Sequence, residues 1–388
     1  MGIVGAGPAG LVLGQLLHLE GIESVVLEDR SRDYVEHRVR AGVLEQGTVD
    51  LLAAIGVGER LRREGIVHRG LELRFNRRGH RIALSDLTGG RTIMIYGQQE
   101  VVRDLIAARL ATGAPTHFEV QDVRLEGFAR DEPRITFRDS AGRSEQIECD
   151  FIAGCDGFHG VSRPSIPAER LTAYELVYPY AWLGILAAVP PSADELIYCN
   201  HERGFALHSL RSPELSRLYL QCDPADRIEA WPEDRIWGEL NTRFATDDGW
   251  SLHEGPIIEK GIAPMRSFVV EPMRCGRLFL AGDAAHIVPA TGAKGLNLAV
   301  HDVSVLAEAI VSWYRDGDSS SLDRYSQTCL RRVWRVQHFS WWMTSMLHRP
   351  PDGDPFQLRL QLSQLEYVCA SEAAARMLAE NYVGLERV

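Results

Sequence analysis

The chain opens on Gly2-Ile3-Val4-Gly5-Ala6-Gly7-Pro8-Ala9-Gly10, and a later apolar run, Val25-Val26-Leu27, ends in Glu28. This order predicts a strand, a glycine turn, a helix and a second strand that ends in an acid. Such a unit places a dinucleotide pyrophosphate at the helix N-terminus and the ribose hydroxyls on the carboxylate. We therefore expect a dinucleotide to bind at Gly5, Gly7, Gly10 and Glu28.

Each glycine has a distinct steric role in this interpretation. Gly5 makes the tight turn, Gly7 lets the backbone approach phosphate, and Gly10 lets the helix pack closely on the strand. A glycine-rich turn alone is weak evidence. The preceding apolar strand, and the acid about 20 residues later, make the pattern specific.

Bulk properties narrow the class of protein. At 388 residues the chain is long enough for two domains, and its net charge of −11 disfavours nucleic-acid binding. No apolar run approaches the roughly 20 residues of a membrane span, so we expect a cytoplasmic protein that contacts neither nucleic acid nor membrane. The seven cysteines are scattered and never spaced C-x-x-C, which favours reduced thiols over disulfides or a metal site.

The pattern of elements predicts two interleaved domains. We expect helices at 48–61, 98–112, 296–315 and within 325–381, and strands within 70–96, 135–137, 147–152 and 175–263. This predicts an α/β fold in which a Rossmann-like domain (1–70, 98–174 and 264–345) is interrupted by a mostly antiparallel sheet domain (71–97 and 175–263) and followed by a helical segment (346–388).

Two further motifs follow buried strand patterns. The first ends in Asp156-Gly157, a pair that by itself is most often only a turn. The second ends in Gly282-Asp283 and leads into a glycine-containing helix start at 292–297. Its carboxylate suits sugar-like hydroxyls, and the backbone donors of the helix start suit developing negative charge.

In this order the three motifs resemble those of the single-component flavoprotein aromatic hydroxylases. Segments without a general flavin role extend the resemblance over nearly the whole chain: 40–47, 96–98, 203–207, 339–345 and 380–385. The resemblance implies FAD as cofactor, NADPH or NADH and O₂ as co-substrates, a small aromatic acid as substrate, and a homodimer.

The resemblance also implies which residues hold the cofactor. Glu28 would bind the adenosine ribose, Arg38 and Arg40 would lie near the pyrophosphate, and Gln98 and Asp283 would meet the ribityl chain. Further cofactor contacts are implied for Val43, Asp156, Gly157, Lys294, Leu296 and Asn297, the last two bordering the isoalloxazine. Elementary chemistry agrees, because arginine suits a diphosphate and a helix N-terminus suits an anionic reduced flavin.

The substrate implied is 4-hydroxybenzoate, a flat ring with a carboxylate and a phenol. Ser209, Arg211 and Tyr219 would bind it on neighbouring strands, and strand alternation places the first two on one face. An arginine fork makes a strong, oriented contact with a buried carboxylate. At the phenol end the resemblance implies Tyr198 and the backbone carbonyl of Ala290.

A proton relay is implied for Tyr198 and Tyr382, with His68 at its outer end. A phenolate is more reactive than a phenol, and a histidine that titrates near neutrality can pass the proton to water. The implied reaction is hydroxylation to 3,4-dihydroxybenzoate through a flavin C4a-hydroperoxide, with Asn297 beside the flavin. The same chemistry on 4-aminobenzoate, or a non-catalytic flavin-binding regulatory protein, are the alternatives.

The sequence departs from the family pattern at two positions. Where Pro-Pro is typical, the chain has Pro289-Ala290, which keeps the carbonyl but loses the fixed φ. Asp29 stands where NADPH users typically carry arginine, and a carboxylate repels a 2′-phosphate, although Arg30 and Arg32 oppose this effect. The choice between NADH and NADPH therefore stays open.

Overall fold

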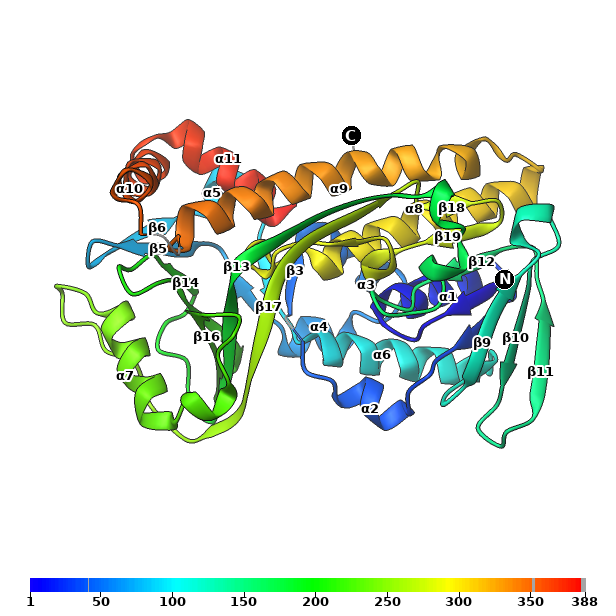
Figure 1. Cartoon of the computed structure of the whole chain (residues 1–388), viewed down its shortest axis with the longest axis horizontal. Helices are drawn as coiled ribbons and strands as arrows, with labels where there is room; N and C mark the ends of the chain where they lie inside the picture. The colour runs from blue at the N-terminus through cyan, green and yellow to red at the C-terminus, as the bar shows by residue number, and fades with distance from the viewer. Residues whose placement is uncertain (41, 351–352, 385–388) are drawn as a thin grey trace.

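The computed structural model describes residues 1–40, 42–350 and 353–384. Ala41 and Leu385, which belong to two of the segments quoted above, lie outside the described residues, as does the rest of the predicted tail from 386 to 388. The helices and strands form a mixed α/β fold with two large sheets, and the long helix α9 (Ser320–Leu347) runs along both (Figure 1). The predicted fold class is confirmed.

The first large sheet follows from the opening apolar runs. β1 (Gly2–Val4) pairs in parallel with β2 (Val25–Leu27) and with β12 (Ile152–Gly154), because each is a short, fully apolar segment that can be buried on both faces. The full strand order is β18 (Arg274–Cys275), β19 (Leu278–Leu280), β12, β1, β2 and β8 (Thr116–His117). The helices α1 (Pro8–Leu19), α6 (Gln98–Ala111) and α8 (Gly295–Asp316) pack together beside it.

The second large sheet has eight strands and is mostly antiparallel. Their order is β20 (His286–Ile287), β17 (Ile257–Glu271), β13 (Thr172–Ala187), β16 (Leu215–Cys222), β15 (Ala206–Ser212), β14 (Leu196–Cys199), β5 (Leu71–Phe75) and β6 (Arg78–Ile82). Alternate side chains of its strands enter two cores. One core lies against α7 (Glu233–Phe244), and the other contains Tyr198 and lies against α9, α10 (Pro355–Ala370) and α11 (Glu372–Val383).

Two smaller sheets and four short helices complete the described chain. The sheets are β3 (Val43–Glu45), β7 (Ile93–Ile95) and β4 (Ile66–His68), and β11 (Ser144–Glu148), β10 (Arg134–Arg138) and β9 (Gln121–Glu126). The helices are α2 (Arg32–His37), α3 (Gln46–Ala54), α4 (Glu59–Glu64) and α5 (Leu84–Leu87).

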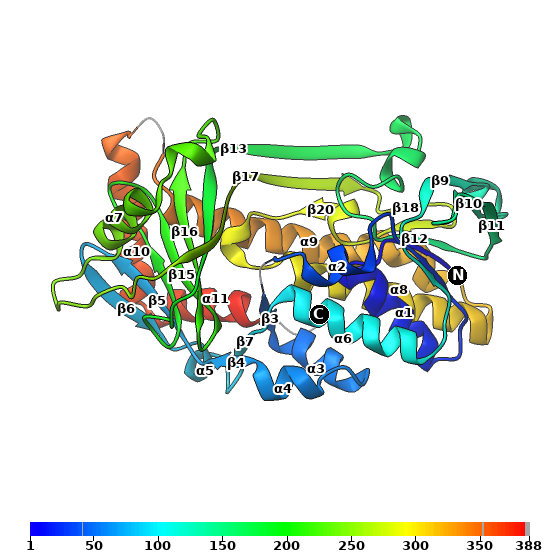
Figure 2. The same ribbon diagram turned by 90° about the horizontal axis from the view of Figure 1, so that it is seen from below.

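The division into domains stays a prediction, but two of its boundaries fall inside strands. Positions 174 and 263 lie within β13 and β17, which run side by side as one long ribbon joining the two large sheets (Figure 2). β7, which the sequence assigns to the antiparallel sheet domain, pairs instead with β3 and β4. Short strands of this kind do not reveal their partners from sequence alone.

Several predicted elements are wrong in detail. The helix expected at 48–61 is divided into α3 and α4, because Gly56 adopts a left-handed φ of 84° between them. The strand-like stretch 70–96 contains α5, and the strand-rich block 175–263 contains α7, which the sequence analysis missed. The strand expected at 147–152 is divided between β11 and β12.

One helix is long and apolar enough to cross a membrane by length and composition, which the sequence analysis did not expect. This helix is α8, but 61% of its most apolar window is buried inside the protein. It packs against α1 and α9. We therefore interpret α8 as a core helix.

Candidate active site

The glycine turn after β1 has the geometry of a dinucleotide cradle. A Cβ on Gly5 would lie 2.3 Å from the Cys155 carbonyl oxygen, and Gly5 has a left-handed φ of 105°. A Cβ on Gly10 would lie 2.0 Å from the Gly5 carbonyl oxygen. By contrast, nothing lies within 4 Å of a Cβ on Gly7. Close backbone packing therefore requires glycine at positions 5 and 10, while Gly7 borders open space that suits a phosphate.

Glu28 closes the turn from the second strand. Its Oε2 accepts a hydrogen bond from the Ala6 N–H at 2.7 Å, and its Oε1 accepts one from the Arg30 N–H at 3.0 Å. Burial, and then the neighbouring Asp29, raise the pKa of Glu28 to about 7. The carboxylate is thus held beside the glycine turn, where a ribose attached to the bound pyrophosphate would lie.

Asp283 lies in the turn after β19, beside charged groups of both signs. It keeps solvent-exposed surface, yet the surrounding protein raises the pKa of its carboxyl, against the positive charges of His286, Arg40 and Arg38. The side chains of Arg38 and Arg40 are themselves exposed. An acid that interacts with two arginines suits a group that carries both hydroxyls and phosphates.

Asn297, in the first turn of α8, forms hydrogen bonds to other protein groups with both atoms of its side-chain amide. Its Oδ1 accepts hydrogen bonds from the Glu45 N–H (2.9 Å) and from the Thr48 hydroxyl (2.8 Å). Its Nδ2 donates to the carbonyls of Val43 (3.0 Å) and Ala293 (3.1 Å). Asn297 therefore fastens β3 and the start of α3 to the N-terminus of α8, beside the half-buried Leu296.

Lys294, just before α8, is buried in an ion pair that the sequence analysis missed. Its ammonium donates to Glu45 Oε1 (2.7 Å) and to the carbonyl of Tyr382 (2.8 Å), and Arg332 donates to Glu45 Oε2 (2.6 Å). Burial favours a higher pKa for Glu45, but the charges of Lys294 and Arg332 outweigh it and lower that pKa. An acid within the apolar run Val43-Leu44-Glu45 was the available signal for such a partner.

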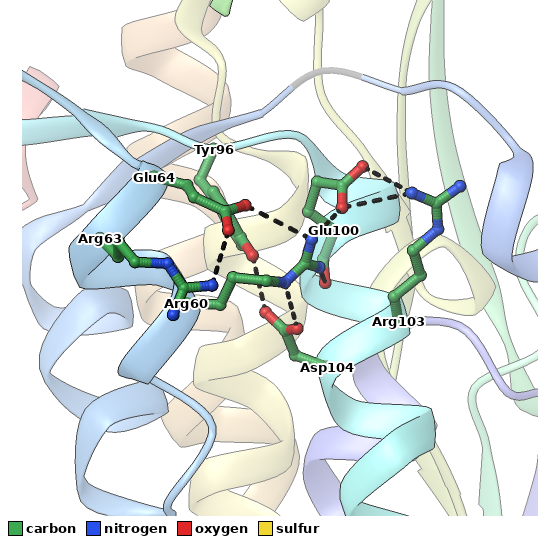
Figure 3. A network of polar contacts seen from close by, with 7 residues as sticks. All are labelled: Arg60, Arg63, Glu64, Tyr96, Glu100, Arg103 and Asp104. Carbon is green, nitrogen blue, oxygen red and sulfur yellow. Dashed lines mark hydrogen bonds and ion pairs between the residues drawn. The ribbon is translucent and has the colours of Figure 1, made fainter.

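Gln98 is half-buried at the start of α6, and a charged network holds this start in place (Figure 3). Arg60 on α4 donates to the Glu100 carbonyl at 3.0 Å and to Asp104 Oδ1 at 2.8 Å. The Tyr96 hydroxyl donates to the other oxygen of Asp104 at 2.7 Å. The network therefore fixes both sides of the Gly97 turn that carries Gln98.

The Asp156-Gly157 motif forms a closed loop. Asp156 Oδ2 accepts a hydrogen bond from the Ser162 N–H at 2.8 Å, and Gly157 has a left-handed φ of 73° with nothing within 4 Å of its Cβ position. Burial raises the pKa of Asp156. The side chain thus shapes the loop through Oδ2, while Asp156 Oδ1 has no hydrogen-bond partner and the Gly157 backbone borders open space.

Two tyrosine hydroxyls meet in the buried core between the antiparallel sheet and α11. The hydroxyls of Tyr198 and Tyr382 are 2.5 Å apart, and the Tyr198 hydroxyl donates to the Thr291 carbonyl at 3.2 Å. Thr291 follows the exposed Ala290 in the 3-10 turn η6 (Ala290–Gly292). The structure therefore brings together Tyr198, Tyr382 and the segment of Ala290, as the resemblance implies.

Arg211 lies on an irregularity of β15. The register pairs Leu210 with Ser216 and Ser212 with Leu215, so Arg211 has no cross-strand partner on β16. Its guanidinium donates to the Arg40 carbonyl at 2.9 Å, while its buried Nε has no partner. Burial lowers the pKa of Arg211, and the nearby Tyr219 opposes that shift. A half-buried cation with an unused, buried donor suits an anionic ligand.

His68 differs most from expectation. Its imidazole is fully buried, neither ring nitrogen has a hydrogen-bond partner, and burial lowers its pKa to about 4. The prediction that this group titrates near neutrality is therefore wrong. The sequence gives no sign of the burial, because His68 lies beside the exposed Val67 and Arg69 on a three-residue strand. A neutral imidazole can still accept one proton and donate another.

Comparison with known proteins supports this geometry. The chain is 51% identical over 383 residues to p-hydroxybenzoate hydroxylase of Acinetobacter baylyi, which covers 99% of this chain and 94% of that protein. It is 26% identical to rifampicin monooxygenase of Streptomyces venezuelae, over 81% of this chain and 65% of the relative.

The fold also matches a solved structure, that of p-nitrophenol 4-monooxygenase from Pseudomonas putida. The TM-score is 0.82 at 19% identity, with 100% of this chain and 98% of that chain covered, which shows a shared fold alone. Residues 1–340 match the family model described as "FAD binding domain". The glycine cradle, Glu28 and Asp283 fit FAD, and the chain belongs to the FAD-binding domain family.

Proposed function

We propose that this protein is an FAD-dependent monooxygenase that hydroxylates 4-hydroxybenzoate to 3,4-dihydroxybenzoate with NAD(P)H and O₂. The pair of hydroxyls from Tyr198 and Tyr382, 2.5 Å apart in a buried core, carries this proposal. Such a pair suits a substrate that must lose a phenolic proton. The 51% identity to p-hydroxybenzoate hydroxylase supports the same substrate.

Arg211 would bind the substrate carboxylate. Its guanidinium is largely enclosed and its Nε has no partner, so a carboxylate would supply the missing acceptor. The hydroxyls of Ser209 and Tyr219 would complete the contact. In this structure Ser209 donates only to the adjacent Leu210 carbonyl at 3.3 Å, and the Tyr219 hydroxyl accepts from Arg217 at 3.4 Å, a long bond that is easily exchanged.

Tyr198 and Tyr382 would carry the phenolic proton away from the ring. The proton would leave the substrate oxygen for Tyr198, whose own proton would pass to Tyr382. The family resemblance implies His68 as the group that then takes up the proton released by Tyr382. Burial raises the pKa values of both tyrosines, so each stays a neutral phenol that relays the proton without keeping the negative charge. Bound FAD would supply the reduction by NAD(P)H and the activation of O₂ that no side chain provides.

Substrate-dependent oxidation of NAD(P)H tests the proposal. Purified protein loaded with FAD is mixed with NADH or NADPH in the presence of 4-hydroxybenzoate, of 4-aminobenzoate, or of neither, and the absorbance at 340 nm is followed. We expect oxidation at least tenfold faster with 4-hydroxybenzoate. Faster oxidation with 4-aminobenzoate than with 4-hydroxybenzoate would identify 4-aminobenzoate as the substrate. Equally slow oxidation in all three mixtures would contradict an enzyme of this class.

We expect relaxed coenzyme choice, with kcat/KM for NADH at least equal to that for NADPH. Asp29 is 69% exposed, and the two arginines that could oppose it are paired with acids: Arg30 with Asp29 at 3.6 Å and Arg32 with Glu36 at 2.6 Å. Their charge is therefore partly compensated. Steady-state kinetics at fixed 4-hydroxybenzoate measure the ratio, and Asp29→Arg should shift it toward NADPH. A tenfold NADPH preference in the wild type would contradict this expectation.

We propose that the protein forms a homodimer through α10. Phe356, Leu360 and Tyr367 are 68%, 50% and 62% exposed, and their spacing places them along one face of the helix. Light scattering after size exclusion is expected to give twice the chain mass of 43.3 kDa. Tyr367→Glu should yield monomers. A monomeric wild type would contradict the proposal.

We also propose a cytoplasmic location. It is supported by the seven cysteines, which are all free thiols in the structure. Reduced thiols persist in a reducing compartment.

A further inference from the structure

A buried histidine and a buried aspartate lie against the Gly282-Asp283 turn, and the site described above uses neither as a ligand. His286 begins β20 and Asp302 lies within α8. The His286 Nε2 is 2.6 Å from Asp302 Oδ2, and the two side chains are 1% and 0% exposed. A pair of this kind deep in a domain is costly to bury, so a specific role is worth seeking.

The same carboxylate oxygen also holds the turn. Asp302 Oδ2 accepts a hydrogen bond from the Gly282 N–H at 3.0 Å, and Gly282 has the left-handed φ of 61° that the turn requires. The Ala285 N–H donates to the Gly282 carbonyl at 2.8 Å, which closes the turn before His286. Asp302 therefore clamps the turn at both ends and ties it to α8, the helix whose first residues border the proposed flavin position.

The charge of His286 affects the pKa of Asp283. Burial lowers the pKa of His286, but the negative charge of Asp302, its hydrogen bond and the charge of Asp283 outweigh burial and raise that pKa. His286 is then an imidazolium, and its charge opposes the rise in the pKa of Asp283 that burial causes. Arg40 and Arg38 act on Asp283 in the same direction.

Other titratable and charged groups also face the pair, and the Arg163 guanidinium donates to the Ala284 carbonyl of the same turn at 3.0 Å. Tyr325 and Cys329 of α9, and Cys155 after β12, interact with Asp302, and burial raises the pKa of each. Among these groups, His286 is the one whose positive charge is lost as pH rises through its raised pKa.

We propose that Asp302 and His286 are positioning residues for FAD, whose buried pair fixes the Gly282-Asp283 turn so that the Asp283 carboxylate can accept hydrogen bonds from the ribityl hydroxyls. The pair acts through Asp283 and touches no reacting atom. Its effect is on the affinity for FAD.

Titration of the apoprotein with FAD, followed by quenching of flavin fluorescence, tests the proposal. Asp302→Asn and His286→Asn are expected to raise the Kd for FAD at least tenfold at pH 7, with circular dichroism unchanged. Ser24→Ala is the control. It removes a buried hydrogen bond from Arg109 (2.9 Å) just before β2, at the end of the parallel sheet opposite the glycine turn, and should lower stability without changing the Kd.

The pH dependence separates positioning from packing. Because the folded-state pKa of His286 is raised, its charge is present at low pH and lost as pH rises through that value. Loss of that charge weakens the contact with Asp302 that fixes the turn, so the wild-type Kd should increase over the same interval. His286→Asn should lack this increase. If Asp302→Asn does not fold, His286→Gln provides the same comparison. A Kd within twofold of wild type in the folded variants, or an unchanged pH profile in His286→Asn, would overturn the proposal.

Discussion

Tyr198→Phe is expected to bind 4-hydroxybenzoate within about threefold of the wild-type affinity but to lose at least nine-tenths of its product yield. Affinity comes mainly from the carboxylate end, whereas reactivity needs the phenolate, and phenylalanine cannot accept the proton that Tyr198 passes to Tyr382 over 2.5 Å. Substrate titration measures binding, and the ratio of 3,4-dihydroxybenzoate formed to NAD(P)H consumed measures yield. The missing product should be recovered as hydrogen peroxide.

Tyr180→Phe is the matched control for this variant. Tyr180 lies in the same buried core but stacks on His348, away from the hydroxyl pair, and should keep the wild-type yield. A normal yield from Tyr198→Phe would remove the tyrosine relay from the account.

Arg211→Lys is expected to raise the Kd for 4-hydroxybenzoate at least tenfold while FAD content stays unchanged. A tenfold change corresponds to about 1.4 kcal/mol. Lysine keeps the charge but cannot present two parallel donors to a carboxylate, and the enclosed position of Arg211 makes the lost contact costly. Equilibrium titration of the flavin spectrum with substrate measures the Kd.

Arg81→Lys provides the comparison for Arg211→Lys. Arg81 is 53% exposed, pairs with Glu195 at 2.7 Å, and lies on β6 at the far edge of the same sheet. The Arg81→Lys variant should have the wild-type Kd for 4-hydroxybenzoate. If Arg211→Lys also has the wild-type Kd, the substrate carboxylate is bound elsewhere.

The opening glycine turn could be predicted from sequence because its requirements are local. Gly5 and Gly10 are fixed by contacts with nearby backbone, and any other residue would clash. The parallel order of β1, β2 and β12 follows from short apolar runs that only a doubly covered sheet can bury. The mixed fold class was therefore accessible from the residues, with the family resemblance in agreement.

The rest depends on contacts between distant segments. Glu45 meets Lys294 and Arg332 only after folding, and the irregularity at Arg211 depends on the register of β15 against β16. The burial of His68 likewise depends on tertiary packing, since its chain neighbours Val67 and Arg69 are exposed. Tyr382, near the end of the chain, could be assigned only through the resemblance, because a tyrosine on a terminal helix has no local signature of a relay.

Incorporation of isotopic oxygen tests the central claim most directly. The FAD-loaded protein is supplied with NADH or NADPH, 4-hydroxybenzoate and ¹⁸O₂, and the product is analysed by mass spectrometry. The account predicts 3,4-dihydroxybenzoate that carries one ¹⁸O atom, formed in nearly equal amount to the coenzyme oxidised. Oxidation of the coenzyme with O₂ reduced only to hydrogen peroxide, or a product whose new oxygen comes from water, would contradict it.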